Sequence, residues 1–168
     1  MKRGNRWKER GFTLIEILVA VSILLLLAAF SIVGYNYANR RSAEMGTRVE
    51  IAALNLGIEN FRTDEGRVPS HEEVSGLGGT GVLYGSLYKD GADSGGKVYV
   101  SALGPNSKEG WTEGADPDVK IIDGWGKELR YRSGDTAENI DYDLWSDGAD
   151  GRSNPDDPDA TESLDDIH

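Results

Sequence analysis

The chain has 168 residues, a formal net charge of −11 and no cysteine. The absence of cysteine excludes disulfide bonds, cysteine-ligated metal centres and cysteine nucleophiles. Residues 1–11 contain five basic residues and one acidic residue, so the rest of the chain carries a net charge of about −15. That acidic balance argues against nucleic acid as a partner.

Residues 12–34 form an apolar segment whose only charged residue is Glu16. A segment of this length approaches the roughly 20 residues that span a bilayer as a helix. The basic flank is expected to stay in the cytoplasm, so the rest of the chain faces outward. A secretory signal peptide has a shorter apolar region followed by a cleavage site of small residues. A simple membrane anchor leaves Glu16 unexplained, because a carboxylate in hydrocarbon is costly and usually marks function.

Residues 10–20, with the sequence RGFTLIEILVA, resemble the class III signal of type IV pilins and type II secretion pseudopilins. The resemblance implies that prepilin peptidase removes the leader, residues 1–11, by cutting between Gly11 and Phe12. It also implies methylation of the new N-terminal residue, Phe12, and a role in assembly for Glu16. A carboxylate paired with the new ammonium group makes burial of both tolerable. We therefore expect Glu16 to pair with Phe12 of an adjacent copy during assembly.

Apolar residues continue at helical spacing beyond the membrane segment, at Ile51, Leu54, Ile58 and Phe61. This pattern predicts one helix from about Phe12 to Asp64, ended by Gly66 and Pro69. Its second part, residues 35–65, is amphipathic and should pack on a globular head formed by residues 66–168. Polar positions around this part are supplied by Arg40, Arg41, Glu44, Arg48, Glu50, Glu59 and Arg62. A coiled-coil stalk is disfavoured because no heptad series persists.

Glycine is frequent in residues 75–97, which predicts a loop-rich connection without the pattern of a phosphate-binding loop. Residues 97–102 alternate modestly, and better strand candidates follow at 119–123, 128–133 and 140–145. Short turns between these runs indicate an antiparallel meander. The predicted fold is α+β: a long N-terminal helix, spanning the membrane in its first half, packed on a small antiparallel sheet as in type IV pilins.

Three later segments resemble the major pseudopilin of the type II secretion system, the general secretion pathway protein G family. They are residues 61–70, 123–132, with the sequence DGWGKELRYR, and 142–151, with the sequence YDLWSDGADG. Two departures are Gly124, where the family usually has proline, and the residues after Gly151.

This resemblance implies a structural subunit that polymerises through its N-terminal helix into a pseudopilus and drives protein export across the outer membrane. The implied partners are copies of the chain, minor pseudopilins, an inner-membrane assembly platform and prepilin peptidase. The implied location is the bacterial inner membrane, with a single pass, a cytoplasmic N-terminus and a periplasmic head. A type IV pilus subunit for adhesion, motility or DNA uptake, and a minor pseudopilin, are the alternatives.

Acidic residues crowd the chain from Asp141 onward, and the simplest interpretation is a solvated acidic tail. Calcium is the alternative, because it binds about 6 to 8 oxygen ligands, often in irregular loops. The resemblance implies such a site, built from the loop at residues 146–151 and a later acidic cluster. Asp150 is the best candidate ligand and Asp147 the second. The others are Asp156, Asp157, Asp159, Asp165 and Asp166.

Enzymatic activity is not expected. The two histidines, His71 and His168, lie in a polar segment and at the end of the sequence, and no pair of carboxylates is placed in an apolar cleft by the pattern. A monomeric, membrane-anchored binding module is a weaker alternative, since it would not need cleavage at Gly11.

Overall fold

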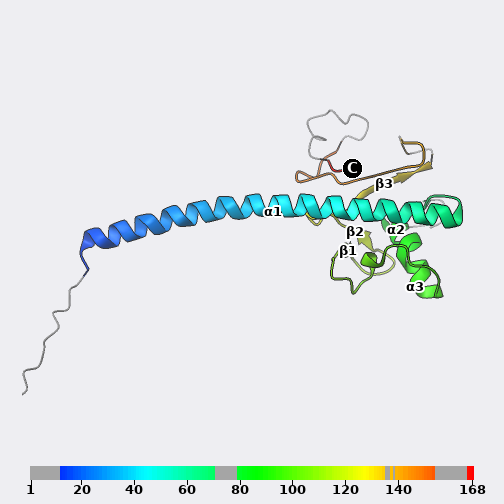
Figure 1. The fold of residues 1–168 in the computed structure, drawn as a ribbon, viewed down its shortest axis with the longest axis horizontal. Coiled ribbons are helices and arrows are strands. Elements are labelled where there is room, and N and C mark those ends of the chain that lie inside the picture. The colour runs from blue at the N-terminus through cyan, green and yellow to red at the C-terminus, as the bar shows by residue number, and fades with distance from the viewer. Residues whose placement is uncertain (1–11, 71–78, 135–136, 138, 154–165) are drawn as a thin grey trace, which may run out of the picture. The chain divides into compact units, whose positions relative to one another are not determined.

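The structure, a computed structural model, describes residues 12–70, 79–134, 137, 139–153 and 166–168. The chain divides into two units, residues 1–39 and residues 40–168. The second unit, called the head below, holds the hydrophobic core. Figure 1 shows its strands and short helices gathered around the C-terminal part of α1. A long helix with small antiparallel sheets confirms the predicted α+β fold.

Helix α1 spans Leu14–Glu65 and confirms the single long helix expected from the apolar spacing. It ends where predicted: Gly66 adopts a φ of 73°, and its N–H donates to the carbonyl oxygen of Arg62 at 2.8 Å. Glycine adopts this left-handed conformation without steric cost. The predicted core face is buried, with 0–8 % of each side chain exposed at Ile51, Leu54, Ile58 and Phe61.

The glycine-rich segment is not a loop over residues 81–94, which corrects the expectation from its composition. Helix α2 (Gly81–Tyr84), the π-helix η1 (Gly85–Lys89) and helix α3 (Asp90–Ser94) follow one another there. Val82, Leu83 and Leu87 are fully buried in the head. Burial of these side chains outweighs the low helix propensity of the glycines between them.

The run at residues 97–102 does not form the strand that its alternation suggested. The N–H groups of Tyr99 and Val100 both donate to the carbonyl oxygen of Leu87, at 2.9 and 3.1 Å. These bonds tie the segment to η1 rather than to a strand. The 3₁₀-helix η2 (Ser101–Leu103) follows and buries Leu103.

The three better strand predictions are confirmed in shortened form. They contain β2 (Lys120–Ile121), β3 (Arg130–Ser133) and β4 (Tyr142–Trp145). β3 and β4 are antiparallel, with Arg130 opposite Trp145 and Ser133 opposite Tyr142. β2 pairs instead with β1 (Thr112–Glu113), which was not predicted, so the described residues form two two-stranded sheets rather than one meander. A bridge between Ile122 and Glu128 connects them.

The core of the head collects residues that are far apart in the sequence. The α1 face meets Leu83 and Leu87 from the helical segment, Ile121 from β2 and Leu129 from the residue before β3. Ile167 joins them with 2 % of its surface exposed, because an antiparallel bridge pairs it with Ser146. Ile167 therefore adds a residue from far along the chain to the core.

The turn between β2 and β3 lies directly on α1. The N–H of Gly124 donates to Oγ1 of Thr47 at 2.9 Å, and Thr47 in turn donates to the carbonyl oxygen of Ala43 at 3.0 Å. A Cβ atom at Gly124 would overlap the backbone of Ala43. Proline has no N–H and could not donate this hydrogen bond to Thr47. Glycine at position 124, where the pseudopilin pattern has proline, makes the contact possible.

We predict that Gly124→Ala lowers the free energy of unfolding of the head by about 1 to 3 kcal/mol, because the turn must move away from α1. Gly85→Ala is the control, since a Cβ there meets nothing within 4 Å. Melting of the detergent-solubilised chain, followed by tryptophan fluorescence, tests this. Equal melting temperatures for the two variants would contradict the close contact.

Candidate functional site

The start of α1 is organised by Thr13 and Glu16. The N–H and the Oγ1 hydroxyl of Thr13 both donate to Oε2 of Glu16 at 2.8 Å, and the N–H of Glu16 donates back to Oγ1 of Thr13 at 3.3 Å. This reciprocal pattern is a capping box, which satisfies N–H groups that a helix start leaves without partners. The spacing Thr-x-x-Glu is visible in the sequence, but the expectation for Glu16 considered only its charge.

Of the predicted processing residues, Gly11 lies outside the described residues, and Phe12 is the first described residue, with 83 % of its surface exposed. The capping bonds use only one oxygen of Glu16, Oε2. The local cap therefore leaves the other oxygen, Oε1, for a further partner. Pairing of Glu16 with Phe12 of another copy stays a prediction.

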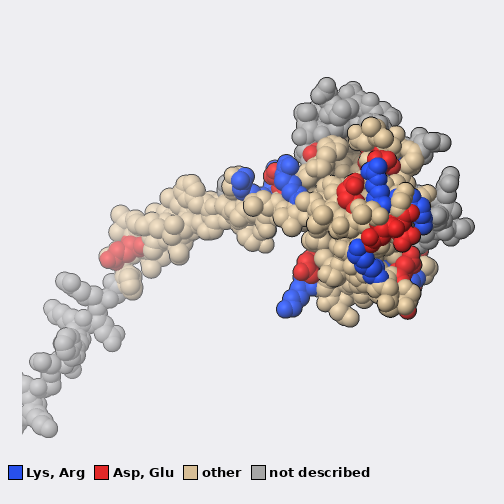
Figure 2. Space-filling view, turned by 45° about the vertical axis from the view of Figure 1, so that its right-hand side comes forward, with Lys and Arg blue, Asp and Glu red and all other residues tan. Residues whose placement is uncertain are grey.

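The first part of α1 presents an apolar surface to solvent. Residues 12–32 are all exposed, and most of them are large and apolar. In Figure 2 the charged side chains are concentrated on the head. Among the described residues, α1 is by length and composition long and apolar enough to cross a membrane.

In the head, Asp123 joins the β2–β3 turn to the acidic loop, residues 146–151. Its Oδ1 accepts from the N–H groups of Trp125 and Lys127, both at 2.9 Å. Its Oδ2 accepts from the hydroxyl of Ser146 at 2.6 Å, and Ser146 Oγ accepts from the N–H of Gly148 at 3.1 Å. Asp123 is 5 % exposed, so these bonds replace the water that its carboxylate loses on burial.

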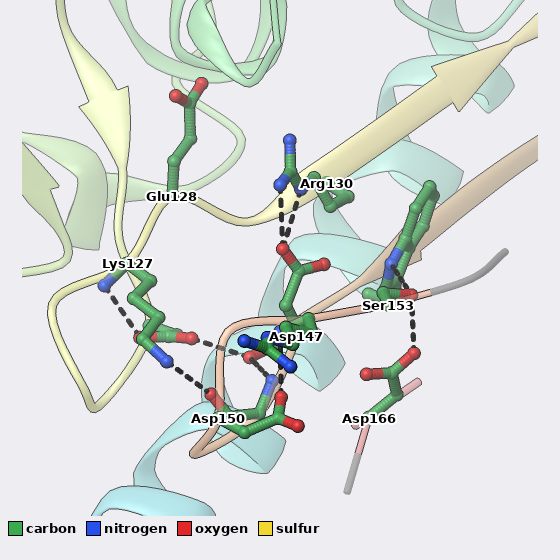
Figure 3. A network of polar contacts seen from close by, with 12 residues as sticks. Lys127, Glu128, Arg130, Asp147, Asp150, Ser153 and Asp166 are labelled. Carbon is green, nitrogen blue, oxygen red and sulfur yellow. Dashed lines mark hydrogen bonds and ion pairs between the residues drawn. The ribbon is translucent and has the colours of Figure 1, made fainter. Parts of the chain in front are cut away.

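The acidic loop is held by two cations from the neighbouring turn and strand (Figure 3). Lys127 Nζ donates to the carbonyl oxygens of Gly148 and Ala149 at 3.2 and 3.0 Å. Nε and Nη2 of Arg130 both donate to Oδ2 of Asp147, at 2.9 and 2.8 Å. These contacts compensate part of the negative charge of the loop, and the sequence analysis assigned no role to either cation.

The candidate calcium ligands have different surroundings in the structure. Asp147 is engaged by Arg130 through Oδ2, while its Oδ1 is buried without a hydrogen-bond partner among the described residues. Asp150 accepts from the N–H of Arg152 at 2.8 Å, and Asp166 accepts from the hydroxyl of Ser153 at 2.6 Å. The remaining candidates, Asp156, Asp157, Asp159 and Asp165, lie outside the described residues. Within the described ranges, no three acidic or histidine side chains gather as a metal site.

Glu50 is a second buried acid, on the face of α1 that packs into the head. It is 2 % exposed, and its Oε1 has no hydrogen-bond partner among the described residues. The apolar surroundings disfavour the charged form, and the nearby Asp123 carboxylate repels it, which together raise the pKa of Glu50 from 4.5 to about 9. The sequence analysis placed Glu50 among the polar positions around the apolar stripe, and the structure shows that this one is buried.

We predict that Glu50 makes the head less stable as the pH rises. In the unfolded chain Glu50 loses its proton above pH 4.5, whereas the folded head keeps it until about pH 9. The free energy of unfolding should therefore fall between these values, by up to about 1.4 kcal/mol per pH unit. Glu50→Gln removes this contribution and should stabilise the head at neutral pH.

Melting curves of the detergent-solubilised chain between pH 5 and pH 8 test this prediction. Glu59→Gln, the same change at an exposed position of α1, is the control and should keep the original pH dependence. Parallel profiles for Glu50→Gln and the unmodified chain would show that the carboxyl group is not buried in neutral form.

Comparisons with known proteins agree with the N-terminal motif. The family described as the prokaryotic N-terminal methylation motif matches residues 8–32. A type IV major fimbrial protein FimA of Dichelobacter nodosus is 28 % identical over 133 residues, which cover 79 % of this chain and 72 % of the relative. A fimbrial protein of the same organism is 36 % identical over 72 residues, so the chain spans only 45 % of that relative. No solved structure matches the chain. The chain therefore carries the N-terminal methylation motif and is similar, beyond that motif, to type IV fimbrial proteins.

Proposed function

We propose that this chain is a type IV pilin-like structural subunit that polymerises through α1 into a filament. The observation that carries the proposal is the methylation motif at residues 8–32, placed on a helix start that is apolar and exposed. Prepilin peptidase would cut between Gly11 and Phe12 and methylate Phe12. The hydrogen bonds and ion pairs described above stabilise the fold. The proposal includes no catalytic role.

The exposed apolar side chains of residues 12–32 must be shielded from water both before and after assembly. Before assembly the bilayer supplies it, because a helix satisfies its own backbone hydrogen bonds in hydrocarbon. The basic leader would hold the N-terminus in the cytoplasm and leave the head outside. In the filament, the helices of other copies would replace the lipid.

Glu16 is proposed to act in this exchange. After cleavage, the ammonium group of Phe12 would enter an apolar environment, where an unpaired charge is costly. The capping box keeps Glu16 Oε2 on Thr13, so an ammonium group of a neighbouring copy can approach Oε1. The local bonds and the pairing between copies are thus compatible.

We predict that Glu16→Val and Glu16→Gln both reduce the yield of sheared filaments at least about tenfold. Glutamine can still serve at this position of a capping box but carries no charge, so it separates the local cap from the charge pair. Thr13→Val removes the Oγ1 bonds, keeps the charge and should still assemble. Intact mass of each membrane-extracted variant shows whether residues 1–11 have been removed and one methyl group added. Normal assembly of Glu16→Gln would contradict the charge pair, and an uncleaved unmodified chain would contradict the proposed function itself.

Two kinds of filament are candidates for this chain, a surface pilus and a secretion pseudopilus. The similarity to fimbrial proteins favours a surface pilus. The resemblance of residues 123–132 and 142–151 to the major pseudopilin favours a pseudopilus of the type II secretion system, assembled from the inner membrane to drive export across the outer membrane. Deleting the gene separates them, because loss of surface filaments supports the pilus and loss of secreted proteins supports the pseudopilus.

We also propose that calcium binds the acidic loop. The carboxylates of Asp150 and Asp166 would bind the ion, and the buried Oδ1 of Asp147 would be a further ligand oxygen. The positive charge of calcium would offset the repulsion between these carboxylates. The bridge between Ser146 and Ile167 and the Ser153–Asp166 hydrogen bond keep Asp166 near the loop. Lys127 already occupies the carbonyl oxygens of Gly148 and Ala149, so further ligands would come from residues 154–165.

We predict that chelation lowers the melting temperature of the head by several degrees, because calcium would bind only the folded state. Asp150→Ala should remove this response, whereas Asp118→Ala, an exposed acid outside the loop, should keep it. Melting curves with calcium and with a chelator measure the difference. Identical curves for the unmodified chain would leave the solvated acidic tail as the interpretation.

A further inference from the structure

A small pocket lies on the head, beside the first turns of the part of α1 that belongs to it. Its volume is about 260 Å³, and residues of α1, the β2–β3 turn, the acidic loop and the last described segment line it. The polar side chains in the lining are Arg40, Glu44, Arg48, Trp125 and Asp166. Sites for whole small molecules usually measure about 300 to 1,000 Å³, so a pocket of this size suits a single chemical group.

Two guanidinium groups line the pocket from α1. Arg40, Glu44 and Arg48 follow one another at intervals of four residues, which places them on one side of the helix. Nε and Nη2 of Arg48 both donate to Oε1 of Glu44, at 3.4 and 3.2 Å. Arg40 forms no ion pair within the part of the chain that the structure describes. One carboxylate therefore offsets one of the two bases, and this side of α1 keeps a positive charge.

The turn between β2 and β3 adds another donor. Nε1 of Trp125 is buried and has no hydrogen-bond partner among the described residues. A buried donor without a partner is destabilising, so an acceptor that reaches it is bound favourably. Indole and guanidinium groups donate hydrogen bonds and accept none. These donors suit the oxygen atoms of an anion, and guanidinium groups suit phosphate in particular.

The surroundings of the pocket disfavour an anion that diffuses freely. The chain has a net charge of −11, and Asp166 lines the pocket beside the acidic loop. Ser153 donates to Oδ2 of Asp166 at 2.6 Å, which compensates this carboxylate in part. An anion that is attached to a surface beside the pocket has a high effective concentration there and overcomes the remaining repulsion.

The place of the pocket along α1 indicates which surface that is. The proposed membrane segment, residues 12–34, ends six residues before Arg40, which is about 9 Å along a helix. The headgroup layer adds about 5 to 8 Å to each side of the hydrocarbon core. Helical side chains lean toward the N-terminus, so the long side chain of Arg40 reaches back into that layer. Tyr35 and Tyr37, both exposed, are of a type that is common at this interface.

We propose that this pocket binds the phosphate group of one phospholipid headgroup, with Arg40, Arg48 and Trp125 as donors. The inference rests on the proposed function, which places residues 12–34 in a bilayer before assembly. It adds a polar contact that holds the head at the membrane surface.

Native mass spectrometry of the detergent-solubilised chain with added dioleoylphosphatidylethanolamine tests the inference. This lipid has no net charge, so a general attraction between charges does not explain its retention. One molecule should stay bound to the unmodified chain, and Arg40→Gln should lower the bound fraction at least about tenfold. Trp125→Phe keeps an aromatic ring without the N–H and should lower it about threefold.

Arg41→Gln is the matched control, because it removes the same charge from the next residue of α1, which is not part of the lining. It should retain the lipid. Both arginines are exposed on α1, so the two variants should melt at the temperature of the unmodified chain. Equal loss of lipid in Arg40→Gln and Arg41→Gln would overturn the inference.

Two further probes separate the possible sources of binding. Dioleoylglycerol has the same acyl chains without phosphate, and equal retention of it would show that only the chains bind. Inorganic phosphate should not displace the phospholipid, and displacement would identify a free anion as the occupant. Either result would overturn the inference while filaments of the cleaved chain leave the proposed function standing. An uncleaved chain that forms no filaments would overturn both.

Discussion

The carboxylate of Asp123 is the interaction on which the site in the head depends. It fixes the turn through the N–H groups of Trp125 and Lys127, and it fixes the acidic loop through Ser146. Because the turn is fixed, Gly124 can lie on α1 and Lys127 can reach the carbonyl oxygens of the loop. Burial raises the pKa of Glu50, and the Asp123 carboxylate adds to that rise. One side chain therefore couples the long helix, the sheet and the acidic loop.

The two parts of α1 obey different constraints within one helix. Residues 17–33 carry no charged side chain and are apolar on nearly every side of the helix, which suits a membrane or a filament interior. After Arg40 only one face is committed to the core, and the charged residues around it suit water. Met45, Val49 and Leu56 in this part of α1 remain exposed. The helix thus changes along its length from apolar on nearly every side to apolar mainly on the face that is buried in the head.

Much of this could be predicted from the sequence, because the deciding signals are local. The apolar run, the i, i+3, i+4 spacing and Gly66 predicted α1 within two residues at each end. The helical turns at 81–94 could not be predicted, since burial of Leu83 and Leu87 overrides the preference of their glycine neighbours. The roles of Lys127 and Arg130 depend on how two hairpin segments meet. Glu50 was misplaced because helical spacing marks the apolar face and does not show which residue at its border is buried.

The position of Ile167 in the core bears on how the molecule is made. Synthesis proceeds from the N-terminus, so α1 is available long before the residue that closes the core beside Ser146. Until residue 167 has emerged, Leu54 and Leu129 belong to a core that lacks one of its members. The head can therefore complete its folding only after residue 167 has emerged, by which time the whole of α1 has been made. Under the proposed function, α1 would be anchored in the membrane before the head has finished folding, so the incomplete head would stay attached to the membrane.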